Sequence, residues 1–161
     1  MLNQLDFLIV LIFVLVPIAQ LKRGFGKAVF DLAALLLAVY TSSTLLEPLA
    51  GAVKLAADPS INEAAVYATS FVVIGGVLML VGKLLYETTL VSVEPFEPLL
   101  GGICGIAIAI ILCHVVVRSL ALGAGPDAVP PVIANSAMGT EFLTFETYHR
   151  LLQVLYTFDR S

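Results

Sequence analysis

The chain has 161 residues, of which 60% are hydrophobic and 12% are charged, whereas soluble domains carry about 25% charged residues. The mean hydropathy of +1.03 argues against an ordinary soluble domain. A net charge of −4 provides no basic surface that could neutralise nucleic-acid phosphates. We therefore expect an integral membrane protein that contacts the lipid bilayer and does not bind nucleic acid.

Four apolar stretches fill most of the chain: residues 5–21, 28–40 and beyond, 66–86 and 99–117. The hydrocarbon core of a bilayer is about 30 Å thick, and about 20 helical residues cross it. The sequence therefore predicts an all-α integral membrane fold with four transmembrane helices in a bundle over residues 1–120. A Gly/Pro-rich linker is predicted over 121–140 and an amphipathic C-terminal helix over 141–161.

Asp6 lies at the start of the first stretch. The positive end of a helix dipole can accommodate a carboxylate there, so Asp6 is predicted to cap the first helix. The alternative is a proton or ion site, because acidic residues inside a membrane are functional candidates.

A short basic hairpin follows the first stretch and contains Lys22, Arg23, Gly24, Phe25 and Lys27. Cytoplasmic loops carry an excess of lysine and arginine. The hairpin is therefore predicted to face the cytoplasm, and four spans then place both ends of the chain outside.

Asp31 lies four residues after Lys27, and such a pair would lower the cost of burying either charge. We therefore expect an ion pair between these two side chains. The alternative is a transport path lined by Asp6, Asp31 and Lys83, although all three lie near the ends of the predicted spans.

Residues 45–65 connect the second and third stretches. Pro48 and Pro59 are expected to break helices in this connection. Tyr40 and Tyr67 flank it and are expected to lie at one membrane interface.

The fourth stretch carries Gly101, Gly105 and Ala109 on one helical face. Small residues let two helix backbones approach closely in lipid. This face is predicted to pack against another helix, and a helix of the same chain is favoured over a second protein.

Three further side chains of the fourth stretch could carry chemistry. Cys104 and Cys113 lie on opposite sides of a helix, so they are predicted to be small buried packing residues that do not bridge. His114 lies near the end of the stretch and is expected to be a hydrogen-bonded interfacial histidine.

The tail carries an apolar stripe at spacings of three and four, formed by Phe145, Tyr148, Leu152 and Leu155. This stripe predicts the amphipathic helix, which we expect to dock a partner. Because a Gly/Pro-rich segment precedes it, the bundle is expected to fold without anything after Ala128.

No nucleophile with a base partner, no metal-binding spacing and no phosphate-binding glycine loop is apparent. The sequence predicts a protein that is not an enzyme and needs no cofactor or metal.

The pattern resembles the colicin V production protein (CvpA) family of bacterial inner-membrane proteins. The residues that carry the resemblance are Leu5-Asp6, Arg23-Gly24-Phe25, Gly101 and Gly105, and more faintly Asn135-Ser136 and Phe142. The chain departs from the family at Glu97-Pro98 and Ile108-Ala109, where the family usually has an Asp-Arg pair and an Arg-Gly pair.

The resemblance implies a four-span protein of the bacterial inner membrane. It is connected with production or export of a peptide toxin, with envelope stress tolerance and with biofilm behaviour. We expect a scaffold or accessory subunit with a protein partner in the membrane. The alternative is a channel or transporter component that forms a path as a homo-oligomer.

Overall fold

The computed structural model describes residues 3–89, 96–125 and 128–145, and their regular structure is entirely helical. The helices are α1 (Gln4–Arg23), α2 (Phe25–Thr44), α3 (Leu46–Ala52), α4 (Pro59–Thr89), α5 (Glu97–Ala124), α6 (Pro131–Ala134) and α7 (Gly139–Thr144). Helices α1, α2, α4 and α5 are long and apolar enough to cross a membrane. The predicted all-α fold with four spans is confirmed, and the chain is a multi-pass membrane protein.

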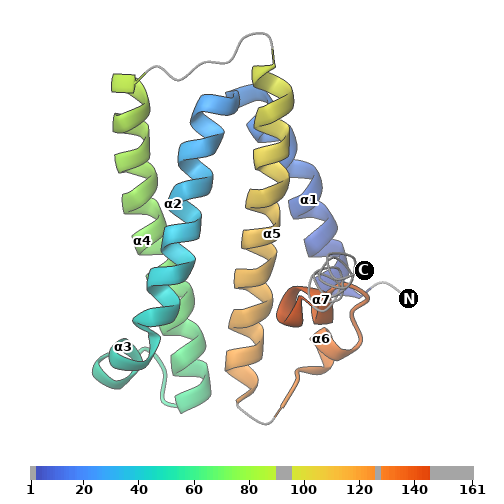
Figure 1. The fold of residues 1–161 in the computed structure, drawn as a ribbon. Helices are drawn as coiled ribbons and strands as arrows, with labels where there is room; N and C mark the ends of the chain where they lie inside the picture. Colours follow the sequence, from blue (N-terminus) through green and yellow to red (C-terminus); the bar gives the residue numbers. More distant parts are fainter. Residues whose placement is uncertain (1–2, 90–95, 126–127, 146–161) are drawn as a thin grey trace, which may run out of the picture.

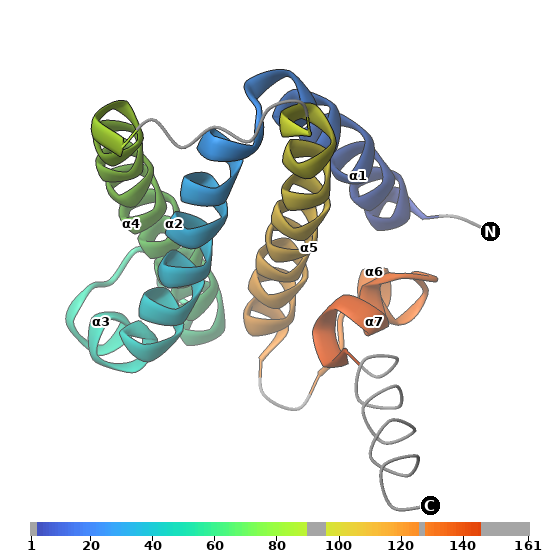
Figure 2. The ribbon, with the colours of Figure 1, turned by 45° about the horizontal axis from the view of Figure 1, so that its top comes forward.

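Helix α5 is the centre of the bundle and contacts α1, α2 and α4. Figures 1 and 2 show α1 and α4 at opposite sides of the α2–α5 pair. The hairpin end is defined here as the end where α1 turns into α2, α4 ends and α5 begins. The tail end is the opposite end, where α3, α6 and α7 lie (Figure 1).

The turn between α1 and α2 consists of one residue, Gly24. Its backbone has φ +82° and ψ 165°, a combination that is essentially restricted to glycine. The Gly24 N–H donates to the carbonyl of Gln20 over 3.1 Å. The glycine of the Arg23-Gly24-Phe25 motif is therefore required by the backbone of the turn.

The glycines of α5 face the backbone of α1. A Cβ atom at Gly101 would lie 2.7 Å from the Gln20 carbonyl oxygen, and one at Gly105 would lie 2.6 Å from the Pro17 Cα. Ala109, on the same face, is fully buried. The predicted close packing of this face within the chain is confirmed.

The connection between α2 and α4 is more ordered than the sequence predicts. Pro48 lies inside α3, and Pro59 is the first residue of α4. Proline is tolerated in the first turn of a helix because the N–H groups there have no helical partner. The Asp58 carboxylate accepts from the N–H groups of Ser60 and Ile61 at 2.9 and 3.2 Å, so the chain starts a helix where we expected a break.

Tyr67 is 0% exposed and packs with Leu35, Phe71 and Ile108. The expectation that it lies at a membrane interface is therefore wrong. The Arg118 guanidinium lies 5.4 Å from the centroid of the Tyr67 ring, and a cation over an aromatic face is an attractive contact. The buried ring thus has a charged neighbour inside the bundle.

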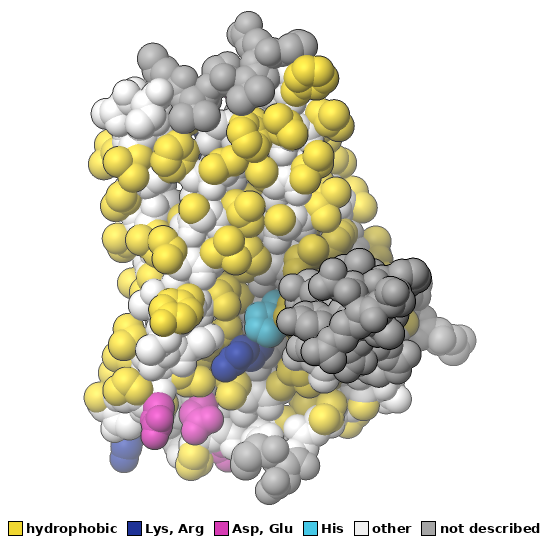
Figure 3. All heavy atoms as spheres, in the orientation of Figure 1, with side chains coloured by type: hydrophobic (Ala, Val, Ile, Leu, Met, Phe, Trp, Pro, Cys, Tyr) yellow, Lys and Arg dark blue, Asp and Glu magenta, His cyan; other side chains and the backbone are white. Residues whose placement is uncertain are grey.

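The outside of the bundle is apolar. Figure 3 shows one face on which hydrophobic side chains predominate between the two ends, with acidic side chains gathered near the tail end. Helices α1 and α2 have 20 residues each, which is about 30 Å of helix. This length matches the hydrocarbon core, and the exposed apolar surface is suited to contact with lipid.

Candidate functional site

Asp6 lies at the first turn of α1 and is 0% exposed. Its N–H donates to Asn3 Oδ1, and its Oδ2 accepts from the Asn3 N–H, both at 3.0 Å. These two bonds form a capping box, which satisfies N–H groups that lack helical partners. The predicted capping role of Asp6 is confirmed.

The Asp6 carboxylate also holds the segment after α5. The Ser136 hydroxyl donates to Oδ1 over 2.5 Å, and the N–H groups of Met138 and Ala137 donate at 3.2 and 3.4 Å. The Asn3 side-chain amide donates to the Val132 carbonyl over 2.7 Å. We call Asn3, Asp6, Ser136 and the N–H groups of 137–138 the Asp6 site. It joins the start of α1 to a segment about 130 positions later in the chain.

Ser136 also organises α7. Its hydroxyl oxygen accepts from the Gly139 N–H over 2.7 Å, at the first residue of that helix. A Cβ at Gly139 would lie 2.9 Å from the Ser136 side chain, so the close approach requires glycine. Within the predicted irregular linker, residues 128–140 are folded and contain α6 and the start of α7.

An apolar core accompanies these hydrogen bonds. Ile133 is fully buried against Leu5, Ile9, Cys113 and Val117. A chain that ended at Ala128 would lose Ile133 together with the partners of Asp6. Contrary to the expectation from sequence, we expect such a truncation to destabilise the bundle.

Helix α7 is hydrogen-bonded to α5 through His114. The His114 Nδ1 lies 2.8 Å from the Phe142 carbonyl oxygen, so the protonated Nδ1 donates this bond. The His114 ring is 5.2 Å from the Phe145 ring, and the Phe13 and Phe142 rings are 5.8 Å apart. The expected hydrogen-bonded histidine is confirmed. Of the predicted tail stripe, Tyr148, Leu152 and Leu155 lie outside the described residues.

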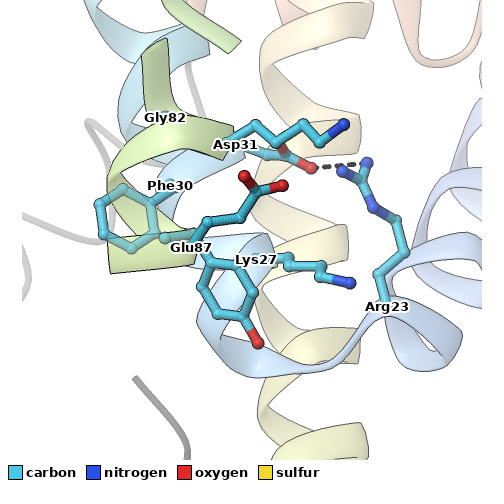
Figure 4. A pocket seen from close by; sticks show the side chains of 8 residues that line it. Arg23, Lys27, Phe30, Asp31, Gly82 and Glu87 are labelled. Atoms are coloured by element: carbon cyan, nitrogen blue, oxygen red, sulfur yellow. Dashed lines mark ion pairs between the residues drawn. The ribbon is translucent and has the colours of Figure 1, made fainter. Parts of the chain in front are cut away.

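A charged pocket of about 230 Å³ lies at the hairpin end between α1, α2 and α4. Figure 4 shows the side chains around it. Its lining residues are Arg23, Lys27, Phe30, Asp31, Gly82, Lys83, Tyr86 and Glu87.

Asp31 is 6% exposed and pairs across the turn. Arg23 Nη1 lies 2.7 Å from its Oδ2, and the Gln20 side-chain amide donates to the same oxygen over 3.0 Å. The predicted ion pair with Lys27 is wrong, because the one-residue turn brings the end of α1 next to Asp31. The Lys27 Nζ lies instead 5.5 Å from the centroid of the Tyr86 ring.

The two ends keep their charged groups apart. Asp31 and Lys83 line the charged pocket, whereas Asp6 lies at the tail end. Among the described residues, the buried polar side chains do not form a continuous row from one end of the bundle to the other. They lie near one end or the other and comprise Asp6, Gln20, Asp31, Ser42, Asn62 and Ser136.

Sequence reasoning missed Asn3, Gln20 and Ser136 as site residues. The Asn3-x-x-Asp6 spacing is a cap signature that could have identified Asn3. Gln20 and Ser136 act through contacts with other helices, which local patterns do not reveal. Cys104 and Cys113 are free and buried, as predicted, and no cluster of three His, Cys, Asp or Glu side chains suited to a metal occurs in the described ranges.

Residues 5–145 match the family model described as colicin V production protein. Comparison with curated proteins and with solved structures gave no match. The matched range includes the one-residue turn, the glycine face of α5 and both partners in the contact between Asp6 and Ser136. This chain therefore belongs to the colicin V production protein family.

Proposed function

We propose that this chain is a non-enzymatic scaffold or accessory subunit in production or export of a colicin- or microcin-like toxin. We place it in the bacterial inner membrane, with both chain ends outside and a further role in envelope homeostasis. Membership of the colicin V production family supports the role in toxin production. The non-enzymatic role rests on the sequence, which offers no nucleophile with a base partner.

The observation that carries the proposal is the attachment of residues 131–145 to the bundle. Asp6 holds Ser136, and His114 holds the carbonyl of Phe142. Because both contacts fix the same segment, residues 131–145 have a defined position at the tail end. The remaining residues of the predicted apolar stripe, Tyr148, Leu152 and Leu155, would then be presented to a partner at the membrane surface.

The glycine face of α5 is not available to that partner. Gly101 and Gly105 are buried against the backbone of α1. The partner surface is therefore assigned to the tail end. The bilayer covers the apolar sides of α1, α2, α4 and α5.

The alternative is a channel or transporter component that forms a path as a homo-oligomer. One observation favours it, since Asp31 and Lys83 share a pocket at the hairpin end. Asp6, however, lies at the opposite end. Over the described residues, one copy of the chain has no row of buried polar side chains between the ends, so a path would have to form between copies.

The test compares the full chain with a chain that ends at Phe145, in a strain that lacks its own copy. The truncated chain keeps the Asp6 site and the His114 contact, so it should insert and melt like the full chain. We expect it to lose toxin secretion and envelope stress tolerance, and to lose any stoichiometric partner in mild detergent. Full complementation would overturn the assignment of the tail as the partner surface.

Reconstitution separates the two candidates. The purified full chain should give no ion flux in liposomes if it is a scaffold. Flux that disappears in Asp31→Asn and Lys83→Gln, while the chain remains a defined oligomer, would favour the channel.

A further inference from the structure

The charged pocket is lined by more cationic than anionic side chains. Among the described residues, Arg23–Asp31 is the one ion pair within 4.0 Å. Lys27 lies over the Tyr86 ring, and Lys83 and Glu87 complete the charged lining. The ammonium groups of Lys27 and Lys83 therefore line the pocket without a carboxylate of the described residues at ion-pair distance.

The charge balance of the pocket defines the ligand it can take. Arg23 and Asp31 neutralise each other, which leaves Lys27 and Lys83 against Glu87 and gives one net positive charge. A ligand with one negative charge would balance it. The Glu87 carboxylate can only accept hydrogen bonds when ionised, so the same ligand should also carry donors.

The surroundings of the pocket are suited to a lipid. Leu80, Gly76 and Val72 lie on the same face of α4 as Lys83, at spacings of three and four. Leu80 is 66% exposed and Val72 is 68% exposed. A Cβ at Gly76 would meet no atom within 4 Å, so an apolar strip open to an acyl chain leads away from the charges.

The position of the charged pocket within the bundle is also suited to a lipid headgroup. The pocket lies where α1 ends and α2 begins, and helices of 20 residues end near the boundary of the hydrocarbon core. Basic pockets between transmembrane helices bind lipid headgroups at this depth. The volume of about 230 Å³ far exceeds the about 15 Å³ that one water molecule requires.

We propose that the charged pocket binds the headgroup of an anionic phospholipid of the phosphatidylglycerol type. The phosphate lies between Lys27 and Lys83, and the glycerol hydroxyls donate to the Glu87 carboxylate. One acyl chain lies along the strip formed by Val72, Gly76 and Leu80. A zwitterionic lipid leaves the net positive charge unbalanced, and phosphatidic acid lacks the headgroup glycerol whose hydroxyls would donate to Glu87.

The experiment measures lipid retention by native mass spectrometry of the full chain. The protein is released from nanodiscs that contain equal amounts of phosphatidylglycerol and phosphatidylcholine. We expect the parent to retain phosphatidylglycerol preferentially. In the double variant Lys27→Gln and Lys83→Gln the preference should fall about 25-fold, since one lysine near an anionic group contributes about fivefold.

The matched control removes two positive charges outside the pocket, in Lys22→Gln and Lys54→Gln, and should keep the parent preference. The double variant Lys27→Arg and Lys83→Arg retains the charges and should keep it as well. Melting curves establish that each variant is folded. An equal loss in the control, or equal retention of both lipids by the parent, would overturn the proposal.

Two further arms distinguish the source of the phosphate and the role of the hydroxyls. Inorganic phosphate should not raise the melting temperature of the chain in phosphatidylcholine nanodiscs, and a rise that depends on Lys27 and Lys83 would assign the pocket to a free anion instead. Glu87→Met should reduce the preference for phosphatidylglycerol over phosphatidic acid. An unchanged preference would contradict the assignment of the headgroup.

Discussion

At the tail end, the Asp6 carboxylate accepts its hydrogen bonds from neutral groups, which are the Ser136 hydroxyl and N–H groups of the backbone. At the hairpin end, the Asp31 carboxylate pairs with Arg23, whose side chain is half-exposed, and with the Gln20 amide. The first arrangement is closed and joins two distant parts of the chain. The second borders the charged pocket, whose Lys27 and Lys83 have no ion-pair partner among the described residues. The two buried aspartates thus differ in role: Asp6 joins two distant segments of the fold, whereas Asp31 lies beside the charged pocket.

The comparison is tested most strongly by truncation. A chain that ends at Ala128 should lose at least about 5 kcal/mol of unfolding free energy, because it loses the partners of Asp6 and the burial of Ile133. A chain that ends at Phe145 should melt like the parent. Circular dichroism melting in detergent measures both, and equal melting of the two truncated chains would show that the tail end contributes nothing to the bundle.

Single substitutions compare the two aspartates directly. Asp6→Ala should cost about 3–5 kcal/mol, because the buried Ser136 hydroxyl and the N–H groups of Asn3 and Ala137 lose their acceptor. Asp31→Ala should cost about 1–2 kcal/mol, since the half-exposed Arg23 can turn to water and the Gln20 amide is the one buried donor in the described contacts that loses its acceptor. The free energies come from reversible unfolding in mixed micelles. The distinction between a closed and an open end fails if Asp31→Ala proves the more costly.

A substitution at the glycine contact between α1 and α5 should lower the unfolding free energy by a smaller amount. Gly105→Leu should cost about 1–3 kcal/mol, because the new side chain meets the backbone of Pro17. Gly76→Leu is the matched control, since a Cβ there meets no atom within 4 Å, and it should melt like the parent. A parent-like melting temperature for Gly105→Leu would contradict the packing of the two helices.

Thiol labelling tests which end of the bundle lies outside the cell, and this prediction does not concern stability. Single cysteines at Lys22 and Lys54, both exposed, are introduced into a chain in which Cys104 and Cys113 are alanine. An impermeant thiol reagent should label the cysteine at position 54 in intact spheroplasts and leave the one at position 22 unlabelled. The opposite result would invert the proposed orientation and place the charged pocket in the outer leaflet.

Much of the architecture can be predicted from the sequence. Four apolar stretches of about 20 residues leave few alternatives to four spans, because unpaired backbone groups are too costly in lipid. The spacing of Gly101, Gly105 and Ala109 identifies a packing face by the same kind of local argument. The cap at Asp6 is also local, since its partner Asn3 is three positions away.

The remaining features depend on contacts between elements. The partner of Asp31 is Arg23 because of the positive φ at Gly24, and the buried position of Tyr67 depends on how α4 meets α5. Nothing near Ser136 in the sequence indicates a bond with a residue 130 positions earlier.

The sequence by itself therefore determined the membrane class, the four spans and the small-residue face, because each follows from hydropathy or spacing within one helix. Only the tertiary structure decided which charges meet, which end is closed and where a pocket remains, since these depend on the relative placement of separate helices.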